Sequence, residues 1–212
     1  VGEHALMMLL TLLNKLMKAD TEVRKGIWLR EENRGIELQG KTVGIIGFGN
    51  MGSAFAKKLS GFDVNIIAYD PYKTIDTVEY PYIKQVSLVQ LQKEADIISL
   101  HVPLTTETKY MINDTFINLC KKEIYIINTA RGKCVNTADL VKHLKTGKVK
   151  GTCLDVHEYE TSSFEKLETL PEPFEYLINS DKTILTPHIA GWIHESNKKI
   201  AEVLVKKIAQ FS

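Results

Sequence analysis

The sequence predicts an α/β fold, a doubly wound parallel sheet with helices on both faces. From residue 41 to residue 210, short apolar β-branched stretches alternate with segments whose apolar residues recur at helical spacing. That alternation is typical of parallel strands joined by crossover helices. In addition, the first apolar stretch runs directly into a glycine-rich turn, Gly47-Phe-Gly-Asn-Met-Gly52, which a helical pattern follows. Ligands of such sheets bind where the strands end, so the residues after each strand are the ones to inspect.

The strands are predicted from runs that suit burial on both faces of a sheet. They cover residues 43–46, 64–70, 96–102, 123–128, 151–156 and 183–186. Between them, polar stretches with proline or threonine predict loops over 71–81 and 105–108. The segment 157–181 carries two prolines and is predicted to be irregular. It is long for a loop, and loops of that length are usually functional or mobile.

Helices are predicted from apolar spacing and end signals. They cover residues 2–19, the stretch from the glycine turn to Ser60, 88–94, 113–119, 137–146 and 193–210. Gly147 has the place of a C-cap, and Ile200, Leu204 and Ile208 share one face of the last helix. The first helix is apolar around its whole circumference, which calls for burial on several sides. The charged segment 20–38 is expected to wrap over the surface, with Trp28 as its anchor.

Three regions follow from this pattern: a long apolar helix and crossover segment over 1–40, a dinucleotide-binding domain over 41–190, and a C-terminal helix over 191–212.

Composition narrows the possible partners and the compartment. The 27 basic and 26 acidic residues give a net charge of +1, which argues against nucleic acid or an anionic membrane as the main partner. Cys120, Cys134 and Cys153 are widely spaced and lack a metal-ligand pattern, so we expect reduced thiols in the cytoplasm and no metal site. The apolar run 5–13 is too short to span a bilayer and has no basic segment before it, so no signal peptide is expected.

The glycine turn fits G-x-G-x-x-G, the phosphate-binding fingerprint of the Rossmann-type fold. Gly47 permits the tight turn, Gly49 lets a pyrophosphate approach the backbone, and Gly52 lets the helix lie close to the strand. The helix N-terminus then offers N–H groups and a positive dipole end to the phosphates. Glycine-rich turns are common, so the fingerprint alone is a weak signal.

Asp70 strengthens the interpretation. It ends the second predicted strand 18 residues after Gly52, near the spacing of the acid that binds the ribose hydroxyls. A carboxylate there repels a 2′-phosphate, which favours NAD over NADP. The simpler alternative is that Asp70-Pro71 only opens a turn.

Arg131, Glu160 and His188 each follow a predicted strand. Taken singly, the arginine could be a surface cation in a turn, the glutamate a solvated member of an acidic stretch, and the histidine a helix cap. Together they form the set that hydride transfer to a 2-oxo acid requires. A guanidinium holds a carboxylate and polarises a carbonyl, an imidazolium donates a proton, and a carboxylate beside the imidazole favours its protonated form and fixes its orientation.

With these residues and the motifs given below, the sequence resembles the NAD-binding domain of a known family, the D-isomer-specific 2-hydroxyacid dehydrogenases. The family includes D-3-phosphoglycerate dehydrogenase. The resemblance covers nearly the whole chain. It rests on these motifs: Val1-Gly-Glu-His-Ala-Leu, Glu37-Leu-Gln-Gly-Lys-Thr-Val-Gly-Ile-Ile-Gly-Phe-Gly49, Tyr69-Asp-Pro71, His101-Val-Pro-Leu-Thr-Thr-Glu-Thr108, Asn128-Thr-Ala-Arg-Gly132, Leu154-Asp-Val156 and Thr186-Pro-His-Ile-Ala-Gly191.

The resemblance implies catalytic roles for Arg131, Glu160 and His188, and it adds residues near the cofactor to those already named. The full predicted cofactor site comprises Gly47, Gly49, Asn50, Met51, Gly52, Asp70, His101, Val102, Pro103, Thr129, Ala130, Arg131, Asp155, His188 and Gly191.

Two departures from the family pattern matter. The family often has Phe or Tyr after Asp-Val and Pro after the glutamate, where this chain has His157 and Thr161. The family also carries a substrate domain built mainly from residues before the first helix, and we expect that domain to be largely missing here, leaving the isolated fragment inactive. The resemblance further implies a homodimer formed through the N-terminal helix region.

The sequence thus predicts an NAD-dependent oxidoreductase that transfers a hydride between NAD(H) and a D-2-hydroxy acid or 2-oxo acid. 3-Phosphoglycerate is the suggested substrate, with hydroxypyruvate and glyoxylate as competitors. One alternative is a non-catalytic NAD-sensing interaction protein of the same fold. Another is a domain that only binds the dinucleotide.

Overall fold

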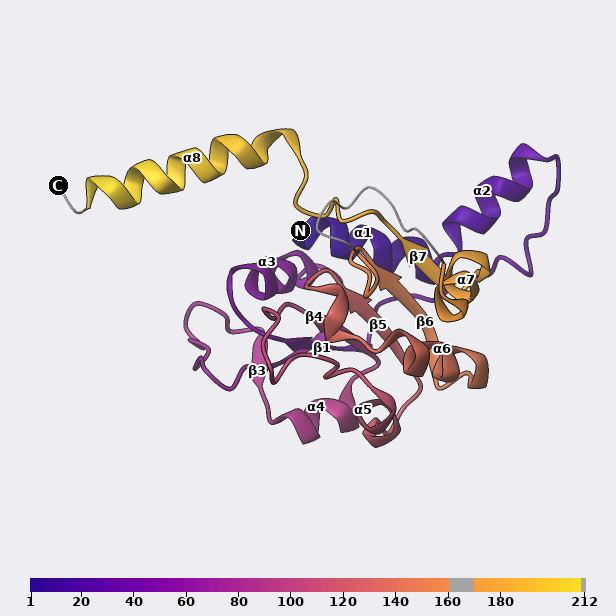
Figure 1. The fold of residues 1–212 in the computed structure, drawn as a ribbon, viewed down its shortest axis with the longest axis horizontal. Coiled ribbons are helices and arrows are strands. Elements are labelled where there is room, and N and C mark those ends of the chain that lie inside the picture. The colour runs from indigo at the N-terminus through magenta and orange to yellow at the C-terminus, as the bar shows by residue number, and fades with distance from the viewer. Residues whose placement is uncertain (161–169, 211–212) are drawn as a thin grey trace.

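The computed structural model describes residues 1–160 and 170–210 and confirms the predicted α/β class (Figure 1). Its parallel sheet has the strand order β3-β2-β1-β4-β5-β6-β7. The strands are β1 Thr42–Ile46, β2 Asn65–Tyr69, β3 Ile83–Gln85, β4 Ile97–Leu100, β5 Ile124–Asn128, β6 Val149–Leu154 and β7 Thr183–Leu185. The order reverses between β1 and β4, the place where ligands bind in doubly wound sheets.

The register brings the strand ends level with one another. Ile46 at the end of β1 pairs with Tyr69 of β2 and with Leu100 of β4. On the other half of the sheet, Leu154 of β6 pairs with Asn128 of β5 and with Leu185 of β7. The turns that follow these strands therefore share one edge of the sheet.

Helices cover both faces of the sheet, and each face has its own apolar core. On one face lie α1 Gly2–Leu13 and α3 Asn50–Leu59, whose buried side chains join those of β1, β2 and β4. The opposite face carries α4 Leu88–Glu94, α5 Asp114–Leu119 and α6 Thr137–Thr146. Gly147 ends α6 in the left-handed conformation, as its C-cap position predicts.

The prediction of one helix over 2–19 was wrong. α1 ends at Leu13, Lys15 takes a left-handed conformation with φ of 50°, and a separate helix α2 covers Leu16–Arg24. The polar Asn14-Lys15 pair interrupts the apolar run, and none of the residues of α2 is buried. The expected burial on several sides is also incomplete, because Met7 is half exposed. Trp28 does not anchor the following segment, since 73% of its surface is exposed.

The segment predicted to be irregular contains a helix, α7 Glu172–Asn179. Its prolines stand at the N-cap and in the first turn, where no backbone N–H is needed inside the helix. Phe174 and Leu177 of this helix are buried against the sheet. The short strand β3 was not predicted either, because its pattern covers only three residues.

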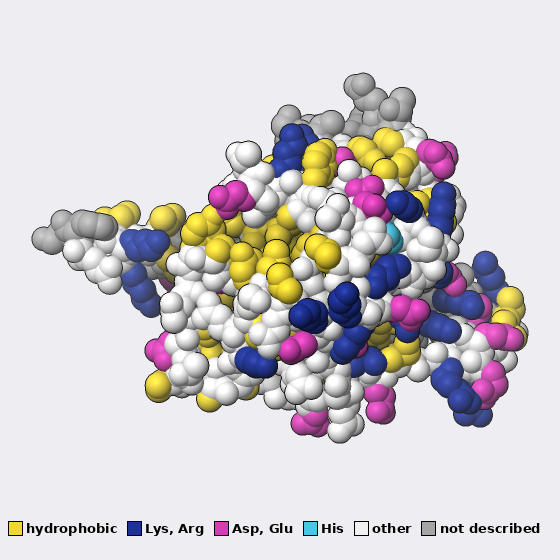
Figure 2. Space-filling model, turned by 90° about the horizontal axis from the view of Figure 1, so that it is seen from below, with side chains coloured by type: hydrophobic (Ala, Val, Ile, Leu, Met, Phe, Trp, Pro, Cys, Tyr) yellow, Lys and Arg dark blue, Asp and Glu magenta, His cyan; other side chains and the backbone are white. Residues whose placement is uncertain are grey.

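The last helix, α8 His194–Ala209, forms as predicted but projects from the body of the molecule (Figure 1). Ile200, Leu204 and Ile208 on its apolar face are exposed. Viewed from below, this projecting end carries hydrophobic and basic side chains together, and the central face mixes acidic with basic side chains beside an apolar area (Figure 2). None of the helices in the described part of the chain has the length and apolar character that crossing a bilayer requires.

Candidate active site

The glycine turn after β1 has the geometry that close approach of a ligand requires. Gly47 has φ of 89°, and a Cβ there would lie 2.6 Å from the carbonyl oxygen of His101. A Cβ on Gly52 would lie 2.1 Å from the carbonyl oxygen of Gly47, so the helix and the turn touch through bare backbone. By contrast, a Cβ on Gly49 would meet no atom of the described residues within 4 Å. The turn is therefore closed on its inner side and open at Gly49.

The N-terminus of α3 faces this open side. Gly49 is its N-cap and no side chain caps the first turn, so the first N–H groups remain available to an anion. Asn50 and Met51, both in the predicted site, are exposed at this helix start.

Asp70 lies beside the glycine turn. Its Oδ2 accepts a hydrogen bond from the N–H of Phe48 at 2.8 Å, and its Oδ1 accepts from Tyr72 at 2.9 Å and from Lys73 at 3.1 Å. The carboxylate is thus held by backbone groups at the end of β2, and it also opens the turn that the simpler alternative proposed. These contacts agree with the turn-opening interpretation of Asp70, and its contact with a ribose stays a prediction.

His101 turns its side chain toward the interior. The ring packs against Phe55 with centroids 5.3 Å apart, and its Nε2 is 2.9 Å from the hydroxyl of Ser99. Burial lowers the pKa of His101 to about 3, so the imidazole is neutral. Only its backbone borders the glycine turn, while Val102 is half-buried and Pro103 is exposed at the strand end.

Arg131 stands in a turn that a buried side chain holds in shape. Asn128, the last residue of β5, accepts from the N–H of Ala130 at 3.0 Å and donates to the carbonyl of Arg131 at 3.0 Å. The guanidinium is exposed, and its Nη1 donates to the carbonyl of Ala130 at 2.6 Å. Asn128 was not predicted as a site residue, although an amide that ends a strand before a turn is the signal that could have identified it.

His188 and Glu160 form a hydrogen-bonded pair. The Nδ1 of His188 lies 3.0 Å from Oε2 of Glu160, and both side chains are partly buried. The other carboxylate oxygen of Glu160 accepts from the N–H of His157 at 2.6 Å. The structure thus brings together two of the three residues predicted for catalysis, and it places Arg131 on the turn after the neighbouring strand.

Asp155 holds the turn that presents His188. Its buried carboxylate accepts from the hydroxyl of Thr186 at 2.5 Å and from the N–H groups of Ile189 and Ala190 at 2.9 Å each. His188 itself has φ of 59°, a conformation that costs a non-glycine residue about 1–3 kcal/mol. The hydrogen bonds around Asp155 offset that cost, so this aspartate fixes the position of the imidazole.

His4 reaches the same carboxylate from α1. Its Nε2 lies 3.0 Å from the hydroxyl of Thr186 and 3.4 Å from Oδ1 of Asp155. Burial lowers the pKa of His4, which favours the neutral imidazole despite the nearby carboxylate. The first helix therefore contributes His4 to the site. This contact was not predicted, because His4 and Thr186 lie 182 positions apart in the sequence.

Two further observations suit a dinucleotide at this edge. The hydroxyl of Thr129 is buried and has no hydrogen-bond partner among the described residues, so it is available to a polar group of a ligand. Gly191 follows the turn that Asp155 holds, and among residues 1–160 and 170–210 only Val1 lies within 4 Å of the place where its Cβ would be. Together with the open Gly49, these features fit NAD along the carboxyl edge of the sheet.

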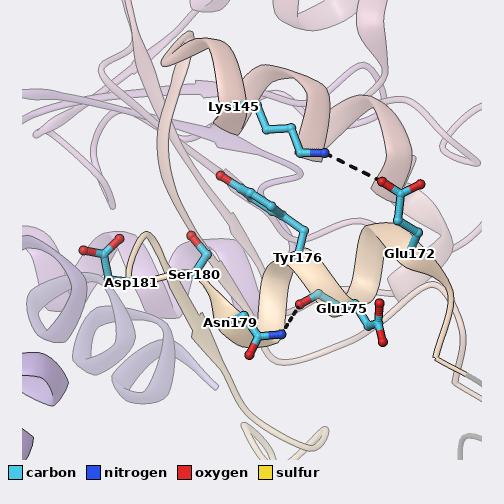
Figure 3. Close-up of a pocket in the computed structure, with 7 residues that line it drawn as sticks. All are labelled: Lys145, Glu172, Glu175, Tyr176, Asn179, Ser180 and Asp181. Carbon is cyan, nitrogen blue, oxygen red and sulfur yellow. Dashed lines mark hydrogen bonds and ion pairs between the residues drawn. The ribbon is translucent and has the colours of Figure 1, made fainter.

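A separate hollow of about 570 Å³ lies between α6 and α7 (Figure 3). Its polar side chains contact one another: Lys145 lies 3.8 Å from Glu172 and over the ring of Tyr176, and Asn179 donates to the carbonyl of Glu175. None of the predicted site residues lines it, and we assign it to the packing of these helices.

Comparison with known proteins places this geometry in context. The sequence profile described as "D-isomer specific 2-hydroxyacid dehydrogenase, NAD binding domain" matches residues 6–190. A glyoxylate reductase of Thermofilum pendens is 39% identical over an alignment 214 residues long, gaps included, that covers 98% of this chain and 60% of the relative. A D-3-phosphoglycerate dehydrogenase of Archaeoglobus fulgidus is 34% identical, with 100% of this chain and 38% of the relative covered.

Solved structures of the same family have a similar fold. The crystal structure of a D-lactate dehydrogenase from Aquifex aeolicus, complexed with NAD and lactic acid, matches with a TM-score of 0.85 and 36% identity. The match covers 99% of this chain and 65% of that one. The chain thus spans less than two thirds of the length of these relatives.

Proposed function

Because the chain belongs to the NAD-binding domains of the D-isomer specific 2-hydroxyacid dehydrogenases, we propose that its protein interconverts a 2-oxo acid and a D-2-hydroxy acid with NAD(H). The observation that carries the proposal is the His188–Glu160 hydrogen bond of 3.0 Å at the carboxyl edge of the sheet. A paired imidazole and carboxylate beside a dinucleotide site are the groups that acid–base chemistry on a carbonyl needs.

The three side chains take distinct roles in this proposal. The exposed guanidinium of Arg131 binds the substrate carboxylate in a fork and polarises its carbonyl. His188 gives a proton to the carbonyl oxygen during reduction and removes it during oxidation. Glu160 bonds Nδ1 of His188, so we assign Nε2 to the proton that the substrate oxygen receives. Bound NAD(H) supplies or accepts the hydride.

The cofactor is held by the turns described above. The glycine turn and the start of α3 bind the phosphates, and Asp70 binds the ribose hydroxyls and disfavours a 2′-phosphate. The buried hydroxyl of Thr129, which has no partner among the described residues, supports its proposed hydrogen bond to the cofactor, and residues 41–190 are the proposed dinucleotide-binding domain.

The substrate is proposed to be a small D-2-hydroxy acid or the corresponding 2-oxo acid. 3-Phosphoglycerate, our first suggestion, stands beside the acids named by the relatives, which include glyoxylate reductases, a hydroxypyruvate reductase of Thermotoga maritima and D-3-phosphoglycerate dehydrogenases. In the relatives, the part of the chain that lies outside the match would supply the rest of the substrate cleft.

A homodimer is proposed through the N-terminal helix region. The arm formed by residues 16–36 carries exposed Leu16, Met17, Val23 and Trp28, an apolar surface that a second copy of the chain would cover. Sedimentation of the chain and of its Trp28→Ser, Met17→Ser variant tests this. A dimer that the double substitution weakens supports the proposal, whereas a wild-type monomer at all concentrations contradicts it.

We propose that the protein acts in the cytoplasm and that neither nucleic acid nor membrane is its partner. Cys120, Cys134 and Cys153 are free and buried, and burial raises the pKa of each thiol, that of Cys120 to about 11. Thiols kept free in this way suit a reducing compartment.

The experiment that tests the function is NADH oxidation by the intact gene product with four acids: phosphohydroxypyruvate, hydroxypyruvate, glyoxylate and pyruvate. Turnover with one of them supports the reaction class and names the substrate. NADH binding without turnover on any of the four contradicts the proposed reaction and favours the NAD-sensing alternative.

A further inference from the structure

His157 contacts all three turns that carry the proposed catalytic residues. Its imidazole Nε2 lies 3.0 Å from the carbonyl oxygen of Thr186, two residues before His188. Its backbone N–H donates to Oε1 of Glu160 at 2.6 Å. Its carbonyl oxygen lies 1.9 Å from the place that a Cβ of Gly132, the neighbour of Arg131, would occupy.

The ring is held from two sides. Phe174 of α7 packs edge-on against it with centroids 5.2 Å apart, while the carbonyl of Thr186 fixes its Nε2. That carbonyl also accepts the backbone N–H of His188 at 3.1 Å. The side chain of His157 and the backbone of His188 therefore meet on one oxygen atom.

The hydrogen-bond pattern identifies the form of the imidazole. A carbonyl accepts only, so Nε2 of His157 carries the proton. Its Nδ1 is buried and has no hydrogen-bond partner in the described part of the chain. The imidazole therefore donates a hydrogen bond from Nε2 and makes none at Nδ1 within the described residues. A phenyl ring could fill the same space but could not donate this hydrogen bond.

We propose that His157 is a positioning residue that fixes the His188–Glu160 pair through its Nε2–H donation to Thr186. The inference rests on the proposed function of that pair. The family often has Phe or Tyr after Asp-Val, and neither of these side chains carries the imidazole Nε2–H that His157 donates.

Two substitutions separate the hydrogen bond from the packing. His157→Phe keeps a ring against Phe174 and removes the donor. The matched His157→Gln removes the ring and keeps an N–H donor at about the same reach. Thermal unfolding of both variants checks that each one folds.

The first readout needs no turnover. In chain labelled with ¹⁵N-histidine, the Nδ1–H proton of His188 reports its hydrogen bond to Glu160. We expect this signal to be lost or broadened in His157→Phe and kept in His157→Gln, with NADH affinity unchanged in both. A wild-type signal in His157→Phe would overturn the inference, as would equal loss in both variants.

The second readout is turnover of the intact gene product. Misplacing a catalytic group by about 1 Å lowers rates by up to ~100-fold, so we expect His157→Phe to lower kcat ~10- to 100-fold and His157→Gln to restore most of it. An unchanged kcat in His157→Phe would overturn the inference. If wild-type protein turned over no 2-oxo acid but His157→Phe still lost the His188 signal, the proposed function would fail and the positioning role would stand.

Discussion

Substituting alanine for Gly132 tests how closely the turns of the site pack against one another. A Cβ at this position would lie 1.9 Å from the carbonyl oxygen of His157 and 2.7 Å from the N–H nitrogen of Glu158, both backbone atoms. An ordinary contact begins at 3.4 Å, so Gly132→Ala must move one turn against the other by about 1.5 Å. No side-chain rotation can relieve the overlap, because the clashing atoms belong to the main chain.

The displacement reaches the proposed catalytic pair through His157 and two hydrogen bonds. The N–H of His157 holds Glu160, and Glu160 holds His188, so a shift of His157 is expected to separate the two side chains. A misplacement of this size lowers turnover by ~100-fold, equivalent to about 2.7 kcal/mol of transition-state stabilisation. Overpacking of this kind lowers the free energy of unfolding by about 1–3 kcal/mol.

The assay is steady-state oxidation of NADH by the intact gene product, together with NADH titration and urea unfolding. NADH should still bind Gly132→Ala, since the turns after β1 and β2, which are proposed to bind the phosphates and a ribose, lie on other strands. Gly61→Ala is the control, because a Cβ there meets no atom within 4 Å, and it should behave as wild type. A Gly132→Ala enzyme that keeps its kcat within about threefold of wild type would refute the reasoning.

Four further substitutions test the remaining roles. Arg131→Lys should lower kcat/KM for the oxo acid ~100-fold, since the bidentate fork is lost; near-normal rates would remove the arginine from the mechanism. His188→Asn should lower kcat by ~100-fold or more while NADH titration stays normal, and unchanged turnover would exclude it as the acid–base group. Asp70→Ala should weaken NADH and improve NADPH, shifting the preference by about tenfold; an unchanged ratio of the two affinities would contradict the ribose contact. The fourth concerns His101, whose folded-state pKa of about 3 lies below the ordinary value of 6.5. Its stabilising effect is therefore complete above pH 6.5 and is lost as the pH falls toward 3. His101→Phe should flatten that pH dependence in urea unfolding, and an identical slope in both proteins would show that other groups cause it.

Local signals in the sequence predicted most of the fold. Buried strands and the helix over 137–146 follow from patterns that neighbouring residues define, and they match the structure closely. The end of α1 at Leu13 was missed because apolar residues continue on both sides of the polar pair Asn14-Lys15, so the two helices look like one in the sequence. α7 was missed because prolines usually interrupt helices, yet here they stand where a helix starts.

The site was only partly predictable. Residues that follow strand ends could be found one at a time, since each carries a functional group at a defined place in the fold. The groups that hold them were not found in this role. Asp155 was predicted only as a residue near the cofactor, and Asn128, His4 and His157 were given no role in the site. Asn128 acts within one turn, whereas Asp155, His4 and His157 act across 29 to 182 positions of the chain. Such contacts depend on the three-dimensional register of the turns, which no local pattern encodes.

The two outermost strands of the sheet have a consequence for how copies of the chain can meet. β3 and β7 have three residues each, so the free edges of the sheet are short. A long bare edge is a template on which another chain can add a strand and start aggregation, and short edges give it little to pair with. Exposed apolar side chains lie on α8 and on the arm formed by residues 16–36, among other places, and backbone groups within helices are already paired. We therefore expect any association of copies of this chain to bury side chains between helices rather than to extend its sheet.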